Sequence, residues 1–154
     1  MLMFIMSIKP RFANQVLDGI KRFELRRYIG IIPKPGDKIV IYASGHVQAL
    51  IGEFTVGRVY KEKPSKLYSI LKSIPNSGIT KDHLKYICGS DEALAIEVLN
   101  PIRYPLKIKL NDLRMIIPDF KPPYSFQVLE EGDPLYQLVV LKLKEYSKIK
   151  NVNY

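Results

Sequence analysis

Short strand-like runs, interrupted by glycine, proline and short helical stretches, recur along the whole chain and constrain its fold most strongly. Apolar and β-branched residues fill the runs at 3–8, 38–43 and 93–99, and polar and apolar residues alternate at 23–27. A longer run at 47–60 contains Gly52 and Gly57, where we expect bulges or bends. This pattern predicts a mixed α+β barrel of five to six strands.

Helical periodicity predicts short helices between these runs, at 10–18, 64–74 and 81–88, with a turn of helix near 110–116. Pro10 suits the first position of the first helix, and Gly19 suits the position just after its end. A terminal helix is predicted after Asp133. The alternation of VVLKLK within 135–146 leaves a strand open as the alternative.

The length and composition indicate a single domain that spans 1–154. The chain has 154 residues, of which 47% are hydrophobic, so it is long enough to bury a core. No apolar run reaches the roughly 18 residues of a membrane span, and the first residues do not form a signal peptide. We therefore expect a cytoplasmic protein. One cysteine and two histidines predict no disulfide, no metal site and no cofactor.

Basic residues exceed acidic residues by 24 to 15, a formal net charge of +9. The excess is concentrated near the start of the chain. Four basic residues stand within seven positions there, namely Lys21, Arg22, Arg26 and Arg27. Such a cluster in a basic protein indicates a phosphate-binding surface. The alternative is an ordinary solvated, lysine-rich surface.

The segment SIKPRFANQVLDGIKRFELRR, residues 7–27, resembles the start of an ASCH domain, a member of the PUA-like group of small β-barrels. The GxKxxE motif of that family is present as Gly19, Lys21 and Glu24, after a strand and an amphipathic helix. PGDKIVIYAS and GEFTVGRV then match the following barrel strands, and PPYSF matches a loop near the same cleft. The resemblance covers residues 3–130, with 131–154 as a terminal helix extension.

The resemblance implies a PUA-like β-barrel with short helices, a C-terminal helix and a cleft beside the first helix. It implies binding of RNA or of a nucleotide-like ligand, in RNA metabolism or in the regulation of transcription or translation. One branch of the group resembles an amidohydrolase of acylated cytidines, which uses a lysine, a threonine three residues later and a glutamate on a later strand. Lys21 matches that lysine, but Glu24 stands where the threonine would be.

The motif residues themselves leave two interpretations open. On a regular strand Lys21 and Glu24 point to opposite faces, so they can pair only if the strand starts after Lys21 or a bulge intervenes. Such a pair either closes one end of the barrel or contains a functional lysine. Glu24 and Arg26 share a face, which usually means a solvated ladder of ion pairs. The alternative is that Arg26 or Arg27 clamps a phosphate.

Further candidates for ligand binding surround this segment. Lys9 and Arg11 flank the start of the first helix, where backbone N–H groups favour an anion. Ser44 ends a strand beside a glycine. A loop made rigid by two prolines presents three more candidates, namely Tyr124, which is expected to stack on a base, and its neighbours Ser125 and Gln127. Phe126, between them, is expected to join the core.

Three classes of function remain. We favour a module that binds RNA or a nucleotide-like ligand over an enzyme, and the sequence leaves open whether turnover occurs. If the chain is an enzyme, it is a metal-independent hydrolase of a modified nucleoside or a ribonuclease, with Lys21, Glu24 and Glu53 as its catalytic residues. DNA is a less expected partner, because a recognition helix is basic and does not pack in the core, and no predicted helix meets both conditions. His83 is expected to be exposed and Cys88 buried, and the oligomeric state is not predicted.

Overall fold

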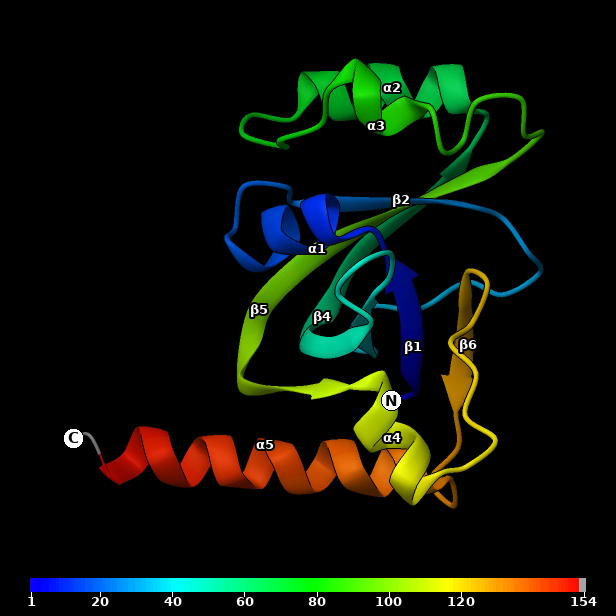
Figure 1. Cartoon of the computed structure of the whole chain (residues 1–154). Helices are drawn as coiled ribbons and strands as arrows, with labels where there is room; N and C mark the ends of the chain where they lie inside the picture. The colour runs from blue at the N-terminus through cyan, green and yellow to red at the C-terminus, as the bar shows by residue number, and fades with distance from the viewer. Residues whose placement is uncertain (153–154) are drawn as a thin grey trace.

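The computed structural model describes residues 1–152 and shows one curved, six-stranded sheet with five helices around it (Figure 1). The elements, in chain order, are β1 (Met3–Ile8), α1 (Pro10–Leu17), β2 (Phe23–Arg27), β3 (Lys38–Ala43), β4 (Ala49–Glu62), α2 (Pro64–Ser73), α3 (Lys81–Leu84), β5 (Ala93–Lys109), α4 (Leu110–Ile116), β6 (Phe126–Leu129) and α5 (Pro134–Val152). The predicted α+β class and strand number are confirmed.

The strands are ordered β2-β5-β4-β3-β1-β6 in the sheet. β1 runs parallel to β3, and the other neighbouring strands are antiparallel. The long strands β4 and β5 bend where their pairing register shifts, next to Gly52 and again between Val56 and Val59. The bends predicted at the two glycines of β4 are therefore confirmed, and they give the sheet the curvature of a barrel.

Three buried clusters hold the helices on this sheet. The largest lies between α1 and the concave strands and includes Phe4, Val16, Ile41 and Phe54. A second cluster packs α4 and the start of α5 against β1, β3 and β5. A third packs α2 and the segment after α3 against β2 and β5. The α2–α3 segment and α5 consequently lie at opposite ends of the molecule (Figure 1).

The structure extends β5 well beyond the predicted 93–99 and adds β6, which was expected to be a loop. The prolines at 101 and 105 give the second half of β5 the sequence pattern of a turn. β2 pairs only with residues 93–97, so these prolines lie where β5 has a partner on one side alone. Proline is tolerated there because its missing N–H would have no acceptor in the sheet.

Two other predictions near the helices need revision. The terminal segment is the helix α5, so the strand alternative for 135–146 is wrong. The helix predicted at 81–88 ends at Leu84, after one turn. Cys88 therefore follows a turn and is exposed, not buried. No helix among residues 1–152 is long and apolar enough to cross a membrane.

The loop before α3 docks directly on the start of β2. The carbonyl of Ser77 accepts a hydrogen bond from the backbone N–H of Arg22 at 2.9 Å. Gly78 has a φ of +73°, and a Cβ at this position would overlap the carbonyl oxygen of Ile20. Glycine is thus required both by the backbone conformation and by the close approach of the two segments.

We predict that Gly78→Ala destabilises the protein more than Gly89→Ala, which serves as the matched control. Gly89 has a similar φ of +82°, but a Cβ there would meet no atom. Gly89→Ala is expected to cost about 1–2 kcal/mol of backbone strain. Gly78→Ala adds the steric overlap, about 1–3 kcal/mol more. Urea unfolding measures both, and equal losses would contradict the close docking of this loop.

Candidate nucleic-acid interface

A cleft of about 720 Å³ opens where β1, β2, the start of α1, the α3 turn and the loop before β6 meet. Eight of the residues singled out in the sequence line it: Lys9, Lys21, Glu24, Arg26, Arg27, Ser44, Tyr124 and Ser125. Segments far apart in the sequence thus place their candidate side chains around one cavity. Its size is within the range of about 300–1,000 Å³ that is typical of ligand sites.

Lys21 and Glu24 form a buried ion pair at the floor of the cleft. α1 ends at Leu17, Gly19 turns the chain with a φ of +77°, and β2 begins only at Phe23. Because Lys21 precedes the regular strand, its Nζ reaches Oε2 of Glu24 at 2.5 Å. The two residues are 3% and 4% exposed. The strand therefore does start after Lys21, and of the two interpretations of Glu24 and Arg26 the solvated ladder is wrong, because Glu24 is buried.

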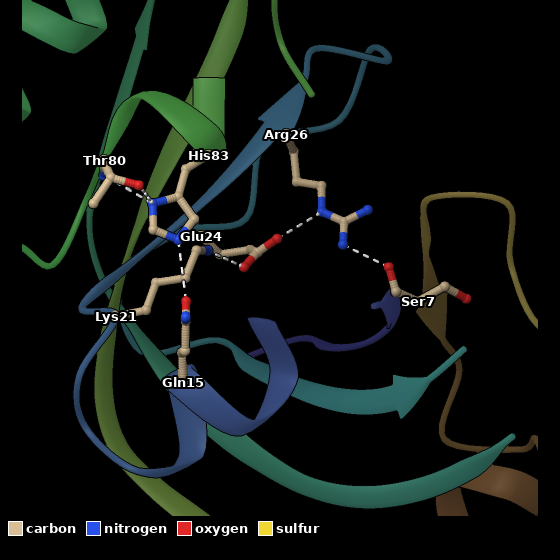
Figure 2. A network of polar contacts seen from close by, with 7 residues as sticks. All are labelled: Ser7, Gln15, Lys21, Glu24, Arg26, Thr80 and His83. Atoms are coloured by element: carbon tan, nitrogen blue, oxygen red, sulfur yellow. Dashed lines mark hydrogen bonds and ion pairs between the residues drawn. The ribbon is translucent and has the colours of Figure 1, made fainter. Parts of the chain in front are cut away.

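Arg26 extends this pair to the opposite side of the barrel, as Figure 2 shows. Its Nε donates to Oε1 of Glu24 at 3.2 Å, and its Nη2 donates to the backbone carbonyl of Ser7 on β1. β2 and β1 are not neighbours in the sheet. The Arg26 side chain thus links two strands that have no backbone pairing. Its Nη1 has no protein partner among residues 1–152 and remains available at the cleft.

Burial and charge act against each other in this network. Burial favours the uncharged form of both groups and lowers the pKa of Lys21, although the carboxylate of Glu24 opposes this shift. Burial alone would raise the pKa of Glu24. The charges of Lys21 and Arg26 and the hydrogen bonds from both outweigh it, so the pKa of Glu24 lies below its ordinary value. Glu24 is therefore ionised at neutral pH.

His83 forms part of the cleft wall and is buried at 5% exposure, so the expectation of an exposed histidine is wrong. Its Nδ1 accepts the backbone N–H of Thr80 at 2.8 Å, which leaves the proton on Nε2, 3.1 Å from Oε1 of Gln15 (Figure 2). Burial, and then the positive charge of Lys21, lower the pKa of His83. Neutral His83 thus fixes α3 against α1 without adding charge.

The rim of the cleft is basic and aromatic. Nζ of Lys9 lies 5.0 Å from the ring centre of Tyr86, and Arg27 donates to the carbonyls of Tyr86 and Cys88. Tyr124, on the loop before β6, also lines the cleft, and its side chain is fully exposed. Sequence reasoning missed Tyr86 and His83, because the short polar segment at 81–88 gave no indication that it would cover the motif.

Three candidate residues lie outside the cleft lining. Arg11 points to Asp82, 3.9 Å away, and Gln127 is exposed on the edge strand β6. Glu53 is 1% exposed on β4, where its carboxylate lies 3.2 Å from Nζ of Lys38. Burial raises the pKa of Glu53. It does not line the cavity that contains Lys21, so the structure does not assemble the expected catalytic pair of Lys21 and Glu53.

The arrangement within residues 1–152 includes no cluster of histidine, cysteine, aspartate or glutamate that could hold a metal ion. The chemistry that the cleft offers is that of fixed cations, hydroxyls and aromatic rings. Such a set binds a phosphate and a planar group together.

We predict that Glu24→Gln lowers the free energy of unfolding by about 3–5 kcal/mol, because it leaves the ammonium of Lys21 buried without its counter-charge. Adding Lys21→Met to Glu24→Gln removes that uncompensated charge and is expected to restore at least half of the loss. Urea unfolding at neutral pH measures both variants.

The matched control is Glu62→Gln, which breaks an ion pair with Lys66 at 3.2 Å on the surface. Exposed pairs of this kind contribute about 0–1 kcal/mol. If Glu24→Gln costs no more than Glu62→Gln, or if the double variant is no more stable than Glu24→Gln alone, the buried pair does not have the role assigned to it.

Of the comparisons with known proteins, only the comparison with solved structures finds similar proteins. No family model matches the sequence, and no curated protein matches it. The ASCH protein from Zymomonas mobilis has a TM-score of 0.76 and 26% sequence identity, over 90% of this chain and 94% of that chain. A variant of it with a tyrosine replaced by phenylalanine has a TM-score of 0.77 and 25% identity, over 92% of this chain and 99% of that chain.

A hypothetical protein from Leishmania major is 12% identical and has a TM-score of 0.55, over 95% of this chain and 97% of that chain, so it shares the fold alone. The Zymomonas structures match over nearly their whole length, and their TM-scores show that they share the fold of this chain. Together with the GxKxxE motif at the floor of the cleft, they show that this chain has the ASCH-domain fold of the PUA-like group.

Proposed function

We propose that this chain is an RNA-binding module that holds one or a few unpaired nucleotides in its cleft. The observation that carries the proposal is the charge of the cleft lining, which contains four basic side chains and one carboxylate. Glu24 is already paired with Lys21 and Arg26, and His83 is neutral. The lining therefore has an unbalanced positive charge, which favours a phosphate backbone.

Aromatic side chains next to these cations support a nucleic acid over a simple anion. Tyr124 is fully exposed and Tyr86 is 36% exposed, and both lie on the rim. A large aromatic side chain that is exposed leaves its apolar surface in contact with water, which is unfavourable unless a ligand covers the ring. Unpaired bases stack on such rings with little regard to sequence, at about 1–3 kcal/mol per base.

The shape of the cleft favours single-stranded RNA over a duplex. A cavity of about 720 Å³, enclosed by α1, the α3 turn and the loop before β6, suits a base that is out of its stack. Ser44 and Ser125 present hydroxyls in the same lining, and a hydroxyl can bond the 2′-OH that distinguishes RNA from DNA. The ASCH-domain fold agrees with this ligand class and with a role in RNA metabolism or in the regulation of transcription or translation.

A second candidate is a metal-independent hydrolase, either a ribonuclease or an amidohydrolase of a modified nucleoside. The observation that favours it is Lys21, a buried lysine with a lowered pKa at the floor of the cleft, since perturbed groups of this kind concentrate at active sites. Structures of the Zymomonas protein include one with a serine replaced by alanine and one with a tyrosine replaced by phenylalanine. Tyr42 and Ser125 supply both residue types to the cleft here.

We predict that single-stranded RNA binds with an affinity that falls steeply with salt, and that Tyr124→Ala weakens it roughly 5- to 150-fold, which corresponds to the loss of one stacked base. Lys9→Ala is expected to weaken binding to all sequences alike and to reduce the slope of log K against log salt by about 0.7, the contribution of one phosphate contact. Fluorescence anisotropy across a salt series measures both effects.

The matched controls are exposed residues outside the cleft: Leu106→Ala for the aromatic variant and Lys107→Ala for the basic one. Neither is expected to change the affinity. Gels of the same samples, run after incubation, distinguish the binding module from the ribonuclease, because cleaved RNA supports the ribonuclease and intact RNA argues against it. The absence of binding to single-stranded RNA, structured RNA and duplex DNA alike would rule out the module.

A further inference from the structure

The turn between β3 and β4, residues 44–48, forms a polar part of the cleft that the contacts above do not explain. Ser44, Gly45 and Gln48 of this turn line the cavity, near Tyr42 and the loop with Tyr124. The side chain of Gln48 is exposed. Its amide makes no hydrogen bond to the protein in the part of the chain that the structure describes, so both its donor and its acceptor are available to a ligand.

The backbone of Gln48 is in the left-handed region, with a φ of +48°. Within residues 1–152, the other non-glycine residues with positive φ are asparagines, Asn76 and Asn100. Asparagine is enriched in this conformation because its short side chain can hydrogen-bond the nearby backbone, which offsets the cost of the left-handed conformation. The longer glutamine side chain gains no such hydrogen bond. Glycine or asparagine would suit this backbone better than glutamine.

The surrounding structure holds the turn in this strained form. The backbone N–H of Ser44 donates to the carbonyl of Ile8 at 3.0 Å, and the N–H of Leu110 donates to the carbonyl of Gln48 at 2.9 Å. Both ends of the turn are therefore anchored, one to β1 and the other to the start of α4. Strain that is held in place at the wall of a cleft is characteristic of a side chain that must be presented to a ligand.

We infer that Gln48 determines which nucleobase the cleft accepts, by pairing its amide with the edge of a base that has left its stack. This inference rests on the proposed RNA-binding function. A glutamine amide presents one donor beside one acceptor, and adenine offers the matching acceptor and donor on its N7 and N6 edge. Gln127, the other glutamine among the ligand-binding candidates from the sequence, lies outside the cleft lining. Gln48, which lines the cleft, is the glutamine placed to read a base.

The test measures the binding of short homopolymeric RNAs of A, C, G and U, of equal length, to the full chain and to Gln48→Gly. The wild type is expected to prefer adenine over the weakest base by at least about fivefold, the discrimination of one bidentate pair. Gln48→Gly is expected to lose the preference while it retains its affinity for the weakest base. Its melting temperature is expected to be no lower than that of the wild type, because glycine relieves the left-handed backbone.

Asn100→Gly is the matched control, since it changes another left-handed residue outside the cleft lining and is expected to keep the preference. A second variant, Gln48→Asn, keeps an amide but withdraws it by one methylene, and is expected to weaken the preference. Two results would overturn the inference while the proposed function stands. In the first, the wild type binds RNA and Gln48→Gly keeps the preference for adenine. In the second, the wild type binds RNA without any preference among the four bases. If the wild type binds no RNA, the proposed function fails first.

Discussion

The bridge from Lys21 through Glu24 and Arg26 to the carbonyl of Ser7 is the interaction on which the architecture of the site depends. The sheet leaves β2 at one edge, and no backbone hydrogen bonds join it to β1. Arg26 makes that connection with its side chain. Burying the charges of Lys21 and Glu24, and partly burying that of Arg26, costs free energy, which is offset only while each has its partner. The same side chains that close the barrel therefore place fixed cations at the floor of the cleft.

The segment between β4 and β5 protects this bridge from water. Ser77 bonds the backbone of Arg22, and Gly78 allows the loop to lie against Ile20. His83 bonds Gln15 of α1 and remains neutral beside Lys21. α2 and the residues after α3 anchor the segment through their own apolar cluster. Together these contacts exclude solvent from Lys21, which lowers its pKa and strengthens its attraction to Glu24.

Local patterns predicted the strands and helices around the motif well, because Pro10, Gly19 and the alternation at 23–27 act on their own neighbours. They did not predict which groups meet in space. The burial of Glu24 depends on Arg26 crossing to β1, and the burial of His83 depends on a loop that folds back from β4. The local sequence around Glu53 does not show which way its side chain points, so only the pairing of β4 opposite Val40 reveals that it is enclosed. The left-handed backbone at Gln48 could not be predicted, because glutamine as a residue type does not indicate that conformation.

The ionisation of Glu24 tests the central claim most directly, namely that a charged bridge closes the barrel. Carbon-13 NMR of the side-chain carboxyl groups, followed from neutral to acidic pH, reports the pKa of Glu24 in the folded protein. The account predicts that Glu24 stays ionised below the ordinary glutamate value, since Lys21 and Arg26 stabilise its charge. Stability from this group is then fully present above the unfolded pKa of about 4.3 and declines as the pH falls through the lower, folded value. A carboxyl that titrates at or above the ordinary value would contradict the charged bridge.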